Sequence, residues 1–242
     1  MRYGIFSDVH SNLEALEAVI AAYRKEAIDK YLCIGDVVGY AANPNECVQK
    51  VKALAMIALA GNHDQASVNL LSIDYFNPQA SEAIIWTKDN LNEQSNFFLE
   101  PLKLVYKNED LTLVHGTLDN PKEFNYMTDD YTASKTFKLL ETNVCFVGHT
   151  HVTEVFIQDK NKRIYYSNEK SMAIDRENKY IINVGSVGQP RDGDTSAAYC
   201  IYDTNQEIVQ IERVGYDIET ARKKIYDAGL PRFFGDRLLV GR

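Results

Sequence analysis

Short apolar runs separated by helix-like segments make up the first part of the chain. The runs at residues 2 to 7, 30 to 34 and 56 to 60 have the composition of buried β-strands. Between the first two runs, apolar residues recur at the spacing of one helix face at Leu13, Leu16, Ile20 and Tyr23. Alternating strands and helices predict a parallel sheet with right-handed crossovers, whose ligands bind beyond the carboxyl ends of the strands.

Capping residues mark where the helices begin. Ser11 and Glu14 have the spacing of a capping box, which predicts that Ser11 caps the first helix. Asn43 followed by Pro44 predicts the start of the second helix, because proline is favoured at the first helical position. A last helix is predicted from residue 217 to 228, ended by Gly229.

The middle and the end of the chain differ in pattern. Residues 65 to 100 and 131 to 140 are predicted to be helical, and residues 117 to 130 form a polar loop that borders a cleft. Further strands are predicted at residues 102 to 107, 110 to 114 and 143 to 148. The later short β runs, at 153 to 158, 163 to 167, 179 to 184, 197 to 203 and 206 to 214, predict a second sheet packed on the first.

Composition limits the classes of protein to which the chain can belong. With 242 residues, 45% of them hydrophobic, and no flexible linker, the chain is expected to form a single α/β domain over residues 1–242. No stretch approaches the roughly 18 apolar residues of a membrane span, so we expect a cytoplasmic protein without a membrane partner. Four widely spaced cysteines without a CxxC pair are typical of buried reduced thiols. A net charge of -8 argues against binding of long nucleic acids, whereas a small anionic substrate remains compatible with it. The oligomeric state is not indicated.

Every histidine of the chain stands at the end of an apolar run or in the turn after one: His10, His63, His115, His149 and His151. A lone histidine in such a place is usually structural, but five at one predicted edge indicate a metal site. Asp8 with His10 and His149 with His151 are pairs two residues apart, which can flank a shared point at a strand end. Imidazoles and carboxylates without thiolates favour manganese, iron or zinc over magnesium or calcium. The number of ligands fits a site for two divalent metal ions.

Five short motifs occur in a fixed order along residues 8 to 151. They are Asp8-Val9-His10, Gly35-Asp36, Gly61-Asn62-His63-Asp64, His115-Gly116 and Gly148-His149-Thr150-His151. Their order and completeness resemble the calcineurin-like metallophosphoesterase superfamily. The resemblance implies a four-layer αββα sandwich, in which two mixed β-sheets are flanked by helices and the metals lie at the sheet edges.

The resemblance also implies roles for the motif residues. One metal would be held by Asp8, His10 and His151, the other by Asn62, His115 and His149, with Asp36 shared between them. A metal-bridging hydroxide would attack the phosphate in line, and His63, which is not a ligand, would act as the general acid. Asp64 has two interpretations, one in which it orients His63 and one in which it caps a helix.

The residues directly after Asp36 bear on the substrate. Phosphoprotein phosphatases of the superfamily continue with an Asp-Arg-Gly triplet, whereas this chain continues with Val37-Val38-Gly39-Tyr40. The absence of that arginine favours a small-molecule phosphodiester, with nucleotides among the candidates. The alternatives are a phosphomonoesterase, a nuclease on short single strands, and a metal-binding scaffold without turnover.

Residues 183 to 193 resemble a loop of bacterial and archaeal members of the superfamily. Within it we expect Arg191 to contact a substrate phosphate, because a guanidinium pairs well with phosphate oxygens. The alternative is a simple turn that ends a strand. Tyr40 and Tyr126 are two of 15 tyrosines in the chain, and core packing is the expected role for both.

Overall fold

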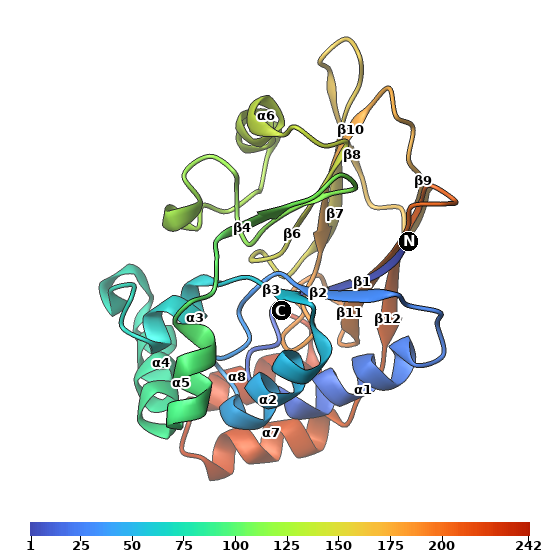
Figure 1. The fold of residues 1–242 in the computed structure, drawn as a ribbon. Helices are drawn as coiled ribbons and strands as arrows, with labels where there is room; N and C mark the ends of the chain where they lie inside the picture. Colours follow the sequence, from blue (N-terminus) through green and yellow to red (C-terminus); the bar gives the residue numbers. More distant parts are fainter.

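The computed structural model describes residues 1–242 and contains two mixed six-stranded sheets (Figure 1). The first has the order β3-β2-β1-β11-β12-β9, with β1 Arg2–Phe6, β2 Lys30–Cys33, β3 Ile57–Ala58, β9 Ser171–Ala173, β11 Ala197–Asp203 and β12 Ile208–Val214. The second has the order β4-β5-β6-β10-β7-β8, with β4 Val105–Lys107, β5 Thr112–Val114, β6 Val144–Val147, β7 Thr153–Gln158, β8 Ile164–Ser167 and β10 Lys179–Val184.

Helices cover the outer faces of both sheets, which confirms the predicted four-layer αββα sandwich (Figure 1). The helices are α1 Leu13–Tyr23, α2 Pro44–Leu54, α3 Asn62–Ser67, α4 Pro78–Asn90, α5 Glu93–Leu99, α6 Asp130–Leu139, α7 Ile218–Asp227 and α8 Arg232–Asp236, with short 3₁₀ turns at η1 Ile73–Tyr75, η2 Pro121–Glu123 and η3 Arg237–Leu239. None of them combines the length and the apolar composition that crossing a lipid bilayer would require.

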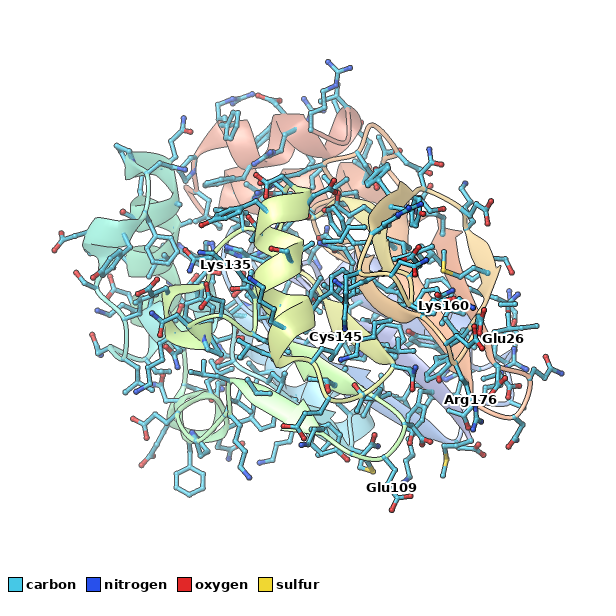
Figure 2. All side chains as sticks on the ribbon, turned by 90° about the horizontal axis from the view of Figure 1, so that it is seen from above. Glu26, Glu109, Lys135, Cys145, Lys160 and Arg176 are labelled. Atoms are coloured by element: carbon cyan, nitrogen blue, oxygen red, sulfur yellow. The ribbon has the colours of Figure 1, made fainter.

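Three apolar layers hold the sandwich together. Between the sheets, side chains such as Ile5, Phe146 and Ile182 are completely buried. The face of the first sheet away from the second packs against α1 and α2, and the corresponding face of the second packs against α6. Figure 2, which looks down on α6, places Cys145 of β6 beside this helix.

The prediction that the late β runs form a second sheet packed on the first is right for β7, β8 and β10 and wrong for β11 and β12, which join the first sheet. The strand β11 pairs antiparallel with β1, with Ile5 opposite Cys200, and β12 and β9 extend the same sheet. The strand β10 instead joins the second sheet between β6 and β7. The reason is that β1 uses only one edge to pair with β2, and the peptide groups on its other edge need partners as well.

Local boundaries differ from the predictions at several places: the predicted helical region 65 to 100 is divided into α3, η1, α4 and α5, and β4 and β5 begin later than predicted. The cap of α1 is Asn12, whose Oδ1 accepts from the backbone N–H of Ala15 at 3.2 Å. Ser11 was predicted to be the cap, but its φ of +59° is unsuited to that role, and its Oγ accepts from the N–H of Gly39. The third strand is reduced to Ile57–Ala58, because Leu59 and Ala60 turn to the backbone of Lys103.

Candidate metal centre

The predicted ligands come together at one edge of the sandwich. The strands β1, β2 and β3 run parallel in the first sheet, and β5 and β6 run parallel in the second, so each group of turns lies at one end. The residues that the structure brings together there are Asp8, His10, Asp36, Asn62, His63, His115, His149 and His151. The two aspartates and the five histidines are all buried.

The backbone at these turns is strained. Five of the predicted ligands have a φ between +49° and +67°: Asp8, His10, Asp36, His149 and His151. Each such residue costs about 1 kcal/mol or more and persists only where the surrounding structure enforces it. Two glycines make the approach of the turns possible, because a side chain at Gly61 would collide with the carboxylate of Asp36 and one at Gly148 with that of Asp8.

One group of donor atoms is formed by Asp8, His10 and His151, which lie within 4.8 Å of one another. The Oδ1 atom of Asp8 is 3.2 Å from Nε2 of His151 and 3.7 Å from Nε2 of His10. The two Nε2 atoms are 3.0 Å apart. Three donors facing one point at these separations form a pocket of the size that a single cation fills.

A second group is formed by Asp36, His115 and His149, also within 4.8 Å of one another. The Oδ2 atom of Asp36 lies 3.3 Å from Nε2 of His115, and 3.6 Å from Nε2 of His10 in the first group. The carboxylate of Asp36 therefore borders both groups. Asn62 contributes a buried side-chain oxygen to the same cavity.

Unpartnered atoms show that these residues fit a pair of cations. Buried polar atoms without a hydrogen-bond partner are concentrated here, at Asp8 Oδ1, Asn62 Oδ1, His115 Nε2 and His149 Nε2. Leaving such atoms unpaired costs about 1 to 3 kcal/mol each. Each is a ligand atom once any proton on it is displaced, so two bound cations would satisfy all four together.

Backbone carbonyls orient three of the imidazoles. The Nδ1 atoms of His10, His115 and His151 lie 3.2, 3.0 and 2.6 Å from the carbonyl oxygens of Val38, Ile34 and Gln189. Since a carbonyl only accepts, each Nδ1 carries a proton, and these contacts turn the Nε2 atom of each ring towards the centre.

The charge states also suit cation binding. Burial acts to raise the pKa of Asp8, but the imidazoles of His151 and His115 hold it well below its usual value. Burial lowers the pKa values of His149 and His151 to about 3, so both rings are neutral near pH 7. His115 is the exception, because the carboxylates of Asp36 and Asp8 outweigh burial and raise its pKa to about 9.

His63 lies beside the ligands and is held by two contacts. Its backbone N–H donates to Asp36 Oδ1 at 2.8 Å, and its Nε2 lies 2.9 Å from the hydroxyl of Tyr40. Burial keeps the pKa of His63 well below its usual value and raises that of Tyr40 to about 12, so both groups are uncharged near pH 7. Sequence reasoning assigned Tyr40 to core packing and missed this contact, although its position four residues after Asp36 was a clue.

Asp64 does not orient His63. Its two carboxylate oxygens accept from the backbone N–H groups of Val38 at 3.1 Å and Gly61 at 3.0 Å, the second contact capping α3. Of the two interpretations of this residue, the structure supports the helix cap.

A cavity of about 550 Å³ opens over the two groups. Arg191 lines it together with Asp36 and His63, and its guanidinium lies 5.7 Å from the centre of the Tyr40 ring. The loop 117 to 130 borders the cavity, as predicted, through residues 122 to 126. Tyr126 was expected in the core, but it is 54% exposed and stacks on the His149 ring, with 4.1 Å between the ring centres.

Relatives of the chain share this architecture. A protein of Methanocaldococcus jannaschii, MJ0912, itself uncharacterized, is 39% identical over 98% of this chain and 97% of its own length. The crystal structure of a metallophosphoesterase from Sphaerobacter thermophilus has 39% identity and a TM-score of 0.88, covering 100% of this chain and 99% of its own. The crystal structure of PH1004 from Pyrococcus horikoshii OT3, at 17% identity and a TM-score of 0.79 over 100% and 98% of the two chains, shares the fold.

The model of the calcineurin-like phosphoesterase superfamily domain matches residues 1–207. Enzymes of this superfamily use a dinuclear metal centre, and the two donor groups lie within the matched part of the chain. This chain therefore belongs to the calcineurin-like phosphoesterase superfamily and is a hydrolase of phosphoester bonds.

Proposed function

We propose that this chain hydrolyses a small-molecule phosphodiester at a pair of divalent metal ions. The ligands in this proposal are Asp8, His10 and His151 for one ion, Asn62, His115 and His149 for the other, and Asp36 for both. The observation that carries it is the pair of donor groups bordered by the carboxylate of Asp36, which together with Asn62 contain four buried atoms without partners. The donor set of imidazoles and carboxylates favours manganese, iron or zinc.

The chemistry of the two ions and that of the side chains are complementary. When bound, a pair of divalent ions supplies positive charge for the phosphate oxygens and lowers the pKa of a water molecule towards about 7. The chain itself holds the carboxylates ionised, keeps His149 and His151 neutral, and buries the reacting centre. In this proposal Arg191, which lines the cavity, donates to a phosphate oxygen.

Proton delivery to the leaving alkoxide is assigned to His63, and Tyr40 positions the imidazole. The 2.9 Å contact between Nε2 and the Tyr40 hydroxyl fixes the ring at the cavity wall. Because burial leaves the imidazole of His63 neutral in the free protein, it would take up a proton when the negatively charged ester binds beside it and raises its pKa, and it would then pass that proton to the alkoxide. Asp64, which contacts only backbone groups through its carboxylate, has no part in this step.

Preference for a diester is supported by the loop after Asp36. Tyr40 occupies the cavity wall where that loop passes, and no arginine of the loop is available to neutralise the second negative charge of a monoester. A diester phosphate carries one charge fewer than a monoester, so it has less need of an arginine in this loop.

A turnover screen of the manganese-loaded protein tests the proposal. The substrates are bis(p-nitrophenyl) phosphate, p-nitrophenyl phosphate, cyclic nucleotides, dinucleotides, nucleoside polyphosphates and short single strands. We expect the diester to be hydrolysed with a higher kcat/KM than the monoester. Faster hydrolysis of the monoester would indicate a phosphomonoesterase, and two bound metals without turnover of any substrate would indicate a scaffold.

A further inference from the structure

Two arginines next to the metal centre share a single acceptor. Nη2 of Arg191 and Nη1 of Arg237 donate to the same side-chain oxygen of Gln189, at 2.9 and 3.1 Å. Arg237 belongs to η3, near the end of the chain and outside the residues that match the family model. Two guanidinium groups are thus held side by side by one neutral amide.

Neither guanidinium lies within 4.0 Å of an aspartate or glutamate oxygen, and Nε of Arg237 donates to the backbone oxygen of Arg242. The arginines that lie within 4.0 Å of a carboxylate oxygen are Arg2, Arg176, Arg213 and Arg222. The neighbour in sequence, Asp192, is paired with Arg213 and accepts from Thr153. Glu123, the acidic residue of the cavity loop, accepts from Asn120 and Asn125. The carboxylates of Asp192 and Glu123 are therefore engaged elsewhere.

Both arginines are partly buried. Burial and the nearby Arg191 lower the pKa of Arg237 to about 10, which leaves it protonated at neutral pH. Each guanidinium packs near an aromatic ring, Arg191 on Tyr40 at 5.7 Å and Arg237 on Phe233 at 5.0 Å. The Nε atom of Arg191 is buried without a hydrogen-bond partner. The two adjacent guanidinium groups, with the unpaired Nε–H of Arg191, form a site where an anion can accept hydrogen bonds.

The pair is fixed in position relative to the metal centre. The backbone oxygen of Gln189 accepts from Nδ1 of His151 at 2.6 Å, and the backbone N–H of Arg191 donates to the backbone oxygen of His151 at 3.1 Å. Arg191 also lines the cavity together with Asp36. An anion held by the arginines would lie next to a phosphate held at the metal centre.

We infer that Arg191 and Arg237 together bind a second phosphate group of the substrate, directly beside the phosphate that reacts. This inference rests on the proposed function and narrows it to esters that contain a diphosphate group. The second phosphate would accept from the two guanidinium groups, whose orientation Gln189 fixes before the substrate arrives.

Calorimetric binding to the manganese-loaded protein, at constant free metal concentration, tests the inference with two probes. The probes are inorganic phosphate and methylenediphosphonate, a diphosphate analogue that cannot be hydrolysed. We expect the wild-type protein to bind the diphosphonate at least about tenfold more tightly than phosphate, and Arg237→Gln to remove most of that preference. An unchanged preference in Arg237→Gln would overturn the inference.

Matched variants separate binding from folding. Arg176→Gln removes an arginine that is 79% exposed at the periphery of the molecule (Figure 2), and it should keep the wild-type preference. Gln189→Glu keeps the shape of the shared acceptor but gives the arginines an internal counter-charge, so it should lower the preference by about tenfold. If a thermal melt shows that Arg237→Gln is unfolded, Gln189→Glu replaces it as the test. An unchanged preference for the diphosphonate in Gln189→Glu would overturn the inference.

Turnover of bis(p-nitrophenyl) phosphate tests the proposed function separately, because this diester has no second phosphate. If the protein hydrolyses this diester but binds the diphosphonate no more tightly than phosphate, only the proposed anion site of the two arginines is overturned. A preference that depends on Arg237 in a protein that hydrolyses no ester would support the anion site and overturn the hydrolysis of phosphodiesters.

Discussion

Two polar hollows lie at opposite ends of the strands, and their charges are arranged differently. At the amino ends of β5 and β6, a hollow of about 460 Å³ is lined by charged residues that pair with one another, Lys107 with Glu141 and Arg176 with Glu207. At the carboxyl ends, the carboxylates and imidazoles are buried and several of their atoms have no partner. In the first hollow the charged side chains already have partners within the protein. In the second, the unpartnered atoms are satisfied only when cations bind, and this makes the second hollow suited to a metal centre.

The largest effect is expected from removal of the shared carboxylate. Asp36→Asn should release or disorder both metals and lower kcat/KM by about 10⁴-fold or more, because one charge borders both donor groups. Metal analysis by mass spectrometry checks this result. The matched control is Asp110→Asn in the opposite hollow, which should keep both metals. Two metals still bound to Asp36→Asn would refute the bridging role.

The next effect concerns the neutral histidine at the edge of the centre. His63→Gln should retain the metals but slow hydrolysis of alkyl esters by roughly 10² to 10⁴, and that of aryl esters much less, because a good leaving group needs no proton. Tyr40→Phe should cause a smaller loss in the same direction, since it removes only the contact that positions the ring. Equal losses of kcat on both kinds of ester would remove His63 as the general acid.

A smaller effect is expected at the cavity wall. Arg191→Ala should raise KM by about tenfold with the metal content unchanged, because a charge-assisted hydrogen bond to the phosphate is lost. Steady-state kinetics on the diester, together with metal analysis, measures both quantities. Arg176→Ala, in the opposite hollow, is the control. Unchanged kinetics in Arg191→Ala would make this arginine a purely structural residue.

The smallest effect concerns a buried carboxylate that belongs to neither hollow. Glu154 on β7 is 9% exposed, and burial raises its pKa to about 7. The folded state binds the carboxyl proton of Glu154 more tightly than the unfolded chain does. The contribution of this proton to the free energy of unfolding is therefore full below about pH 4.3 and is lost as the pH rises through 7. Glu154→Gln should therefore be more stable than the wild type by about 2 kcal/mol at pH 8 and nearly equal to it at pH 4. Urea unfolding at the two pH values measures this difference, and an equal difference at both would contradict the assignment.

Many of the helices and strands could be predicted from the sequence because each depends on residues that are close together in the chain. The apolar runs that form β1, β2 and β6 and the caps at Asn43 and Asp217 each depend on a few neighbouring residues. The gathering of the ligands could also be predicted, because parallel strands bring their carboxyl ends to one edge of a sheet. The wrong predictions concern contacts between residues far apart in the sequence. The pattern of β11 indicated a strand but not that β1 would be its partner.

The sequence by itself determined the family, the αββα layers and the set of side chains that can hold two metals. Only the tertiary structure decided how those side chains are supported: Tyr40 contacts His63 across 23 residues, Arg237 reaches Gln189 across 48, and Asp64 turns to the backbone of Val38. Periodicity and motif spacing describe which face or end of an element a residue occupies. They carry no information on which distant atom completes its hydrogen bonds, because that depends on how the packed layers bring separate turns together.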